Sequence, residues 1–163
     1  MPPKNCIIIE SKKEGYFSNV RTCKLNGINP ELVIDYSNKK LKYFGIPKLI
    51  LAHKMYGFPY LDIKGEYGIS NRDNYVIIKD NIEDLIKIQK FLSTKTALYL
   101  FETTRYRMKY LEKYAFQLIP DITLLEDFPK IINDETIAEY FEFDEKNIKA
   151  IENLHNKSYK FFI

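Results

Sequence analysis

Cysteine and histidine are scarce in this chain, which holds two of each among its 163 residues. A secreted domain of this size usually carries more cysteines, because disulfides compensate for a small core in an oxidising compartment. The two cysteines are Cys6 and Cys23, and neither they nor His53 and His155 have the spacing of zinc ligands. The sequence therefore predicts a reducing, cytoplasmic location and no bound metal.

Long apolar runs and glycine motifs are also missing. No stretch approaches the roughly 20 apolar residues that cross a membrane. The N-terminal stretch MPPKNCIIIES has too short an apolar run for a signal peptide and no small-residue cleavage site. The six glycines are scattered and form neither a P-loop nor a dinucleotide-binding pattern. We therefore expect no membrane partner and no cofactor.

What the chain does contain is the composition of one folded domain. Its 163 residues are 45% hydrophobic and 29% charged, which suffices to bury a core. The net charge of +3 is too small to require a polyanionic partner, but it is unevenly distributed. Residues 1–64 carry net +6 (11 basic, 5 acidic), and residues 126–163 carry net −4 (5 basic, 9 acidic). An anion-binding surface would therefore lie early in the chain.

Short apolar or alternating runs, separated by turn residues, predict strands in the first half of the chain. The predicted strands are Cys6–Glu10, Leu32–Tyr36, Leu41–Phe44, Pro47–Tyr56, Tyr60–Ile63, Tyr67–Ile69 and Tyr75–Lys79. Between the turn at Ser11–Gly15 and the breaker cluster Gly27–Pro30 the sequence predicts no element. Ser70–Asn74 is a polar loop, since Asn and Asp suit turns.

The period of the apolar residues becomes helical after Lys79. Asp80 is the predicted N-cap of a first helix, with Leu85, Ile88 and Leu92 on one face, and Ser93 is the predicted N-cap of a second. Further helices are predicted at Arg105–Phe116, Glu135–Phe141 and Glu145–Lys157, capped in the last two cases by Asn133 or Asp134 and by Asp144.

The predicted fold class is α+β, with a mixed β-sheet in the N-terminal two-thirds followed by a helical C-terminal third. We expect a single domain, 1–163, made of N-terminal strands (1–46), a core (47–120) and a helical tail (121–163).

Basic, amide and aromatic side chains gather at three places in the 47–120 core. They are Lys48, His53 and Lys54 along one strand, Asn71, Arg72 and Asn74 in one loop, and Arg105, Arg107 and Lys109 at a helix start, interleaved with Tyr106 and Tyr110. Arg, Lys, Asn and Tyr are the side chains that contact DNA phosphates and base edges. The alternative is a solvated charged face whose tyrosines pack on the core.

Two carboxylates that are close in sequence are compatible with a different activity, the metal-dependent cleavage of nucleic acid. Asp62 and Glu66 lie near each other with Lys64 between them, which is part of the pattern of a metal-dependent nuclease. A second correctly placed acid is missing, and charges beside turns explain the pair equally well. A nuclease therefore stays an alternative reading.

Several segments, in order, carry a resemblance to a known family. They are Pro47–Leu51 (PKLIL), the Tyr60–Tyr67 hairpin, Asn74–Ile78 (NYVII), Ile88–Thr94 (IQKFLST) and a helix ending at Gln117–Pro120 (QLIP). This order resembles the target-recognition (specificity) region of type IIG restriction-modification N6-adenine DNA methyltransferases. The tail, Thr136–Phe141 and Ile148–Glu152, is similar to the ending of the same enzymes, so the resemblance covers roughly residues 47–152.

The resemblance implies a stand-alone module that binds duplex DNA and reads a target site in restriction-modification or DNA methylation. The chain departs from the family in one respect: it has no Asn/Asp-Pro-Pro-Tyr/Phe tetrapeptide and no glycine motif for S-adenosylmethionine. We therefore expect no enzyme activity from this chain alone, and a separate methyltransferase catalytic subunit as its partner. A protein-interaction or structural protein with no nucleic-acid role is the main alternative.

Overall fold

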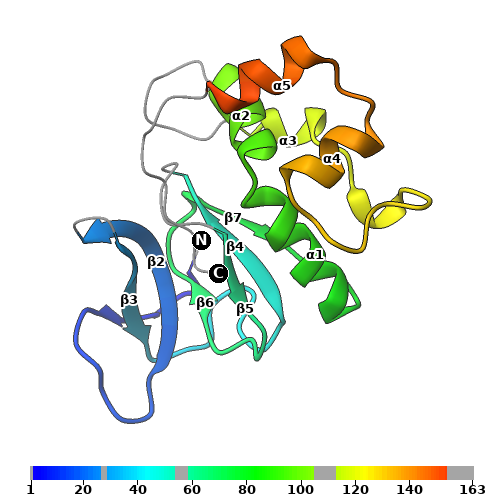
Figure 1. The fold of residues 1–163 in the computed structure, drawn as a ribbon. Coiled ribbons are helices and arrows are strands. Elements are labelled where there is room, and N and C mark those ends of the chain that lie inside the picture. The colour runs from blue at the N-terminus through cyan, green and yellow to red at the C-terminus, as the bar shows by residue number, and fades with distance from the viewer. Residues whose placement is uncertain (1, 27–28, 54–58, 105–112, 154–163) are drawn as a thin grey trace.

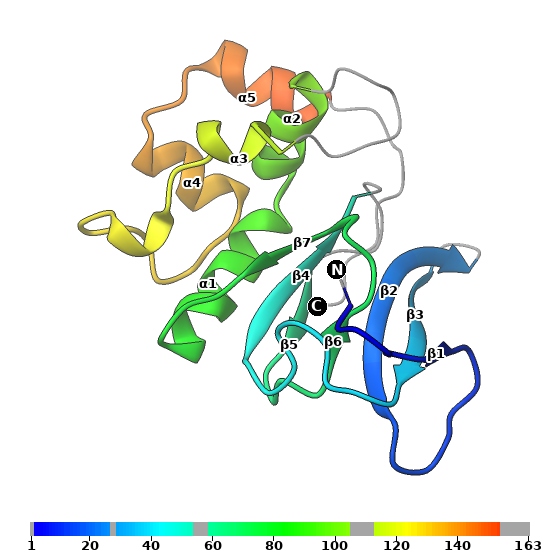
Figure 2. The same ribbon diagram turned by 180° about the vertical axis from the view of Figure 1, so that it is seen from behind.

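The computed structural model describes residues 2–26, 29–53, 59–104 and 113–153 of the chain. Within them, seven strands come first and the helices follow. Figures 1 and 2 show the same order of layers from opposite sides: a sheet built on a long hairpin, a central sheet, and a group of helices. The α+β prediction is confirmed.

The first layer, the hairpin sheet, has the strand order β1-β3-β2-β6. Strands β2 (Phe17–Asn26) and β3 (Asn29–Ser37) form its long antiparallel pair, with a bulge between Val20 and Thr22. Strand β1 (Ile8–Ile9) pairs with β3, and β6 (Gly68–Ile69) adds in parallel to β2. Strand β6 thus brings a distant part of the chain against the hairpin.

Two predictions for this part of the chain are wrong. Strand β2 was not predicted, because its buried positions include Asn19 and Cys23 as well as Val20, and these do not form an apolar alternation. The predicted strand Leu41–Phe44 is a turn. Tyr43 there has a φ of 67°, which no β-strand residue adopts.

The second layer, the central sheet, has the order β5-β4-β7, and both pairings are antiparallel. Its strands are β4 (Lys48–Ala52), β5 (Tyr60–Asp62) and β7 (Asn74–Ile77), each within a predicted strand or one residue beyond it. All five residues of β4 are buried. A strand covered on both faces reads as a continuous apolar run, which is why KLILA predicts a strand so clearly.

The third layer consists of short helices. They are α1 (Ile82–Leu92), α2 (Lys95–Thr103), α3 (Ala115–Leu118), the 3₁₀ turn η1 (Ile122–Leu124), α4 (Asp134–Tyr140) and α5 (Glu145–Glu152). The N-caps of α1 and α2 are Asn81 and Thr94, each one residue after the predicted cap. Asp144 caps α5, as predicted, and Asn133, one of the two residues predicted as candidates, caps α4; both helices start with full capping boxes. The first part of the predicted helix Arg105–Phe116 lies outside the described residues.

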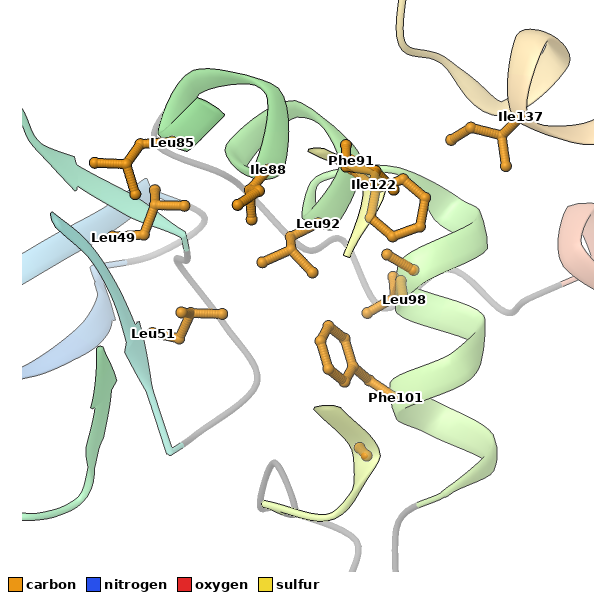
Figure 3. Close-up of a cluster of buried hydrophobic side chains, with 12 residues drawn as sticks. Leu49, Leu51, Leu85, Ile88, Phe91, Leu92, Leu98, Phe101, Ile122 and Ile137 are labelled. Atoms are coloured by element: carbon orange, nitrogen blue, oxygen red, sulfur yellow. The ribbon is translucent and has the colours of Figure 1, made fainter. Parts of the chain in front are cut away.

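The apolar core lies between the central sheet and the helices. Figure 3 shows Leu49 and Leu51 of β4 pointing toward Leu85, Ile88 and Leu92. These side chains are 8% exposed or less, and the predicted inner face of α1 is confirmed. Phe91, Leu98, Phe101, Ile122 and Ile137 extend the same cluster across α1, α2, η1 and α4. Burial of this apolar surface fixes the helices against the sheet.

A search of the helices within the described residues finds none with the length and apolar character needed to cross a membrane.

Candidate nucleic-acid interface

The predicted recognition loop, Ser70–Asn74, joins β6 to β7 and closes on itself as a turn. Asn71 Oδ1 accepts a hydrogen bond from the backbone nitrogen of Asp73 at 3.1 Å, the arrangement of an Asx-turn. Asn74 Nδ2 donates to the carbonyl of Asn71 at 3.1 Å and to the carbonyl of Arg21 at 3.0 Å. The Asn74 amide nitrogen therefore holds the loop against β2, and is not available to a ligand in this arrangement.

Ser70 attaches the start of the loop to the hairpin sheet. Its backbone nitrogen donates to the Val20 carbonyl at 3.2 Å, and its Oγ donates to Asp35 Oδ2 at 2.6 Å. The residue before it, Ile69, donates its backbone nitrogen to the Lys42 carbonyl at 3.1 Å. Since a hydrogen bond to an ionised carboxylate is stronger than one between neutral groups, Asp35 is the main anchor of the loop.

A buried polar network lies beneath this anchor. Asn19 Nδ2 donates to Asp35 Oδ1 at 3.2 Å and to Ser37 Oγ at 3.0 Å, and Asn19 and Ser37 are fully buried. Asn19 Oδ1 faces Gly68, where a Cβ atom would lie 2.5 Å from it. A side chain at position 68 would therefore have to displace the Asn19 amide, which donates to Asp35.

A hollow of about 530 Å³ opens beside the loop. Its lining residues are Pro2, Leu41, Lys42, Tyr43, Ile69, Ser70, Asn71, Arg72 and Asn74. Of the predicted DNA-binding residues, this space, which we name the loop hollow, brings together Asn71, Arg72 and Asn74. Arg72 is exposed, and no hydrogen bond or ion pair within the described chain uses its guanidinium.

Lys42 and Tyr43 also line the loop hollow, and sequence reasoning missed both. The Lys42 Nζ atom lies 4.7 Å from the centroid of the Tyr43 ring, a cation–π contact. Tyr43 has a positive φ, and side-chain-bearing residues in that region are enriched at functional sites. The signal was the sequence KYFG at 42–45, in which a lysine and two aromatics precede a turn glycine.

His53 also lies beside the recognition loop. It follows β4, and its backbone nitrogen donates to the Asp73 carbonyl at 2.8 Å. Its ring is half-buried and meets the Tyr75 ring edge-on, with 6.0 Å between the centroids. The structure therefore joins His53 to the loop, although its side chain already contacts the sheet.

Lys48 does not belong to this surface, which corrects its assignment as a DNA contact. Its side chain is fully buried, and its Nζ lies 2.6 Å from Asp62 Oδ2 and 3.1 Å from the Ile46 carbonyl. Asp62 in turn accepts hydrogen bonds from the backbone nitrogens of Glu66 and Tyr67 at 2.9 and 3.1 Å. Alternation along β4 places Lys48 on the face opposite Leu49, and there it neutralises a buried carboxylate.

Four further predicted residues, Lys54, Arg105, Arg107 and Lys109, lie outside the described residues.

Asp62 and Glu66, the carboxylates on which the nuclease alternative rested, do not form a metal site. Asp62 is 2% exposed and is fully engaged with Lys48 and two backbone nitrogens. The described ranges contain no cluster of three or more His, Cys, Asp or Glu side chains arranged to hold a metal ion. Cys6 and Cys23 are free thiols, and burial raises the pKa of the Cys23 thiol to about 12, so it stays protonated at neutral pH.

Comparisons with known proteins give this chain no relative: no family model, no curated protein and no solved structure matches it.

Proposed function

We propose that this protein is a DNA-binding specificity module, and that the loop hollow is the surface that meets the duplex. The observation that carries the proposal is the placement of Arg72 and Asn71 on a loop whose backbone is anchored through Ser70 to Asp35. Sites that read DNA bases are built on backbone that a supporting network of contacts holds in place. The resemblance of residues 47–152 to target-recognition regions agrees with this assignment.

Each side chain at the hollow has a distinct role in this proposal. Arg72 and Lys42 would neutralise phosphates or, in the case of Arg72, donate in bidentate fashion to a guanine edge. Asn71 retains a free amide nitrogen that can meet a base acceptor, since its Oδ1 is used within the turn. Tyr43 offers an aromatic face for a base or sugar. Asn74 positions the loop and does not read a base.

The catalytic step would belong to another polypeptide. The chain has neither the methyltransferase tetrapeptide nor a glycine motif for S-adenosylmethionine. A separate methyltransferase subunit would bind the cofactor and extrude the target adenine, while this module sets where the duplex is held.

A binding measurement at two salt concentrations tests the proposal. The wild-type chain and Arg72→Ala are titrated against a short fluorescent duplex of mixed sequence, at about 50 mM and about 200 mM salt. We expect affinity to fall with salt, and the slope of log K against log salt to shrink by about 1 in Arg72→Ala. Lys149→Ala, an exposed charge change in the acidic helical tail, is the matched control and should leave the slope unchanged.

Two results would contradict the proposal. One is the absence of duplex binding at the lower salt concentration. The other is a salt slope that is the same in Arg72→Ala as in the wild type. In either case a stable complex with another protein, seen by size-exclusion chromatography, would favour the interaction protein that is the alternative.

A further inference from the structure

A second cavity lies on the helical side of the central sheet, away from the loop hollow. Its volume is about 440 Å³, and it is bounded by β7, α1, α3 and η1. Its apolar lining includes Tyr75, Phe91 and Phe116. We name this space the helix cavity. Pockets that bind small molecules have volumes of about 300–1,000 Å³, so its size fits that class of ligand.

The walls of the helix cavity are apolar and include aromatic rings. Phe116 meets Tyr75 and Phe101 edge-on, with centroids 5.3 and 5.4 Å apart. This aromatic group holds α3 against β7 and α2, while Ile88 and Leu92 of α1 supply aliphatic contacts opposite. An apolar wall of this kind takes up hydrocarbon or an aromatic ring by removing its surface from water.

Three charged side chains line the cavity, Lys79, Asp121 and Lys113, and we refer to them as the charged rim. Lys79 forms an ion pair with Asp121, and its Nζ also donates to Thr123 Oγ1 at 3.2 Å. Burial alone would raise the pKa of the Asp121 carboxyl, but hydrogen bonds from Lys79 and Thr123 outweigh burial and lower it. Asp121 therefore stays ionised at neutral pH and compensates the charge of Lys79.

Lys113 is the other cation of this rim. It is exposed at the start of the α3 segment, and no ion pair within the described residues engages its ammonium group. Since Lys79 and Asp121 compensate each other, the described lining residues carry one net positive charge. Gln117 adds a neutral hydrogen-bonding group to the lining.

We propose that the helix cavity binds a small amphiphile with an apolar body and one carboxylate. The apolar body would lie among Tyr75, Phe91 and Phe116, and the carboxylate would meet Lys113 and Gln117. A single negative charge matches Lys113, the one cation of the described lining that has no ion-pair partner within the described residues. This site does not include the loop hollow, so a test of ligand binding here is also independent of DNA binding.

The test uses the full chain and two probes that differ in charge, sodium octanoate and 1-octanol, in isothermal titration calorimetry. We expect octanoate to bind the wild type with a one-to-one stoichiometry and more tightly than 1-octanol. In Lys113→Gln, octanoate should bind about fivefold more weakly, the factor given by an exposed ion pair at the upper end of its range. Binding of 1-octanol should not change in that variant.

Two more variants locate the site. Gln117→Trp places a large ring at the mouth of the cavity from an exposed position, and it should weaken both probes. Lys90→Gln removes an exposed charge from α1 outside the cavity lining, and it should leave both unchanged. The proposal is overturned if octanoate does not bind, if 1-octanol binds as tightly, or if Lys113→Gln and Gln117→Trp bind both probes like the wild type. Circular dichroism establishes that each variant is folded.

Discussion

The two halves of this protein differ in how much apolar surface they bury. On the helical side of the central sheet, the core is a continuous apolar cluster from Leu49 to Ile137. On the hairpin side, fully or nearly buried positions include Asn19, Asp35 and Ser37, connected by hydrogen bonds. The helical half is thus held together by burial of apolar surface, and the hairpin half depends more on a directional polar network.

This difference agrees with the proposed function. Apolar contacts have little directionality, so they fix the helices as a body without placing any one atom exactly where chemistry needs it. Hydrogen bonds impose distance and angle, so the Asp35 network sets the position of Ser70 and of the loop after it. Arg72 and Asn71 thus belong to the half whose interior is connected by hydrogen bonds.

We expect the largest loss of stability when the ion pair between the two halves is removed. Lys48 lies on the central sheet, and its partner Asp62 holds the backbone of Glu66 and Tyr67, which lead to β6. We expect Lys48→Met to lower the free energy of unfolding by about 3–5 kcal/mol, since it leaves a buried carboxylate without its cation. Urea denaturation measures this loss.

Lys64→Met is the control for the buried pair, because Lys64 is exposed in the adjacent turn. It should change the free energy of unfolding by no more than about 0.5 kcal/mol. Equal losses in the free energy of unfolding for the two substitutions would show that the buried Lys48–Asp62 pair stabilises the fold no more than an exposed lysine does.

The apolar half can be tested by cutting back one buried side chain. Leu85→Ala, at a position that is 0% exposed, should cost about 2–5 kcal/mol of stability because it leaves a cavity in the core. Ile82→Ala, 39% exposed on the same helix, should cost much less. We expect the folded fraction of Leu85→Ala to bind duplex DNA like the wild type, and weaker binding there would mean that the halves are not independent.

The polar half can be tested by removing the Ser70 hydroxyl. Ser70→Ala deletes the hydrogen bond to Asp35 and should cost about 1.5–3 kcal/mol, the range for a hydrogen bond to a charged group. Because the loop loses its anchor, DNA binding should weaken in the variant even where it is fully folded. Thr123→Ala, a hydroxyl lost at the other cavity, is the comparison and should leave DNA binding intact. Unchanged DNA affinity in Ser70→Ala would show that the hydrogen bond between Ser70 and Asp35 is not needed for DNA binding.

The last prediction concerns the pH dependence of stability that Cys23 adds, which appears only above neutral pH. Burial raises the pKa of Cys23 to about 12, whereas an unfolded thiol ionises near about 8.5. The unfolded state therefore loses its proton first, so this contribution to stability is complete below about pH 8.5 and is lost as pH rises toward 12. Denaturation curves across this range should show a shallower decline for Cys23→Ala than for the wild type or Cys6→Ala.

The sequence predicted best where one physical signal dominated. Strand β4 and the inner face of α1 followed from apolar pattern alone, since both serve the apolar core. The cap Asp144 followed from local hydrogen bonding, which needs no knowledge of the tertiary fold, and the cap of α4 was narrowed in the same way to Asn133 or Asp134.

The missed features depend on contacts between distant segments. Strand β2 is held by β3 and β6 and buries Asn19, and no local pattern identifies an asparagine that will find partners at positions 35 and 37. Lys48 looked like a surface cation because its partner, Asp62, lies in another strand. Within the site, the Ser70–Asn74 loop was recognised from its turn residues, but Lys42 and Tyr43 join it only through the contact of β6 with the 41–45 turn.

The anchoring of the recognition loop separates stability from specificity. Ser70 and Asn74 hold the backbone through Asp35 and Arg21, while the Arg72 side chain makes no hydrogen bond or ion pair within the described chain. Position 72 can therefore be exchanged without loss of the interactions that keep the loop in place. In terms of the proposed function, single substitutions at this position would change which DNA the protein reads, and a library randomised at residue 72 would sample new binding preferences on an unchanged scaffold.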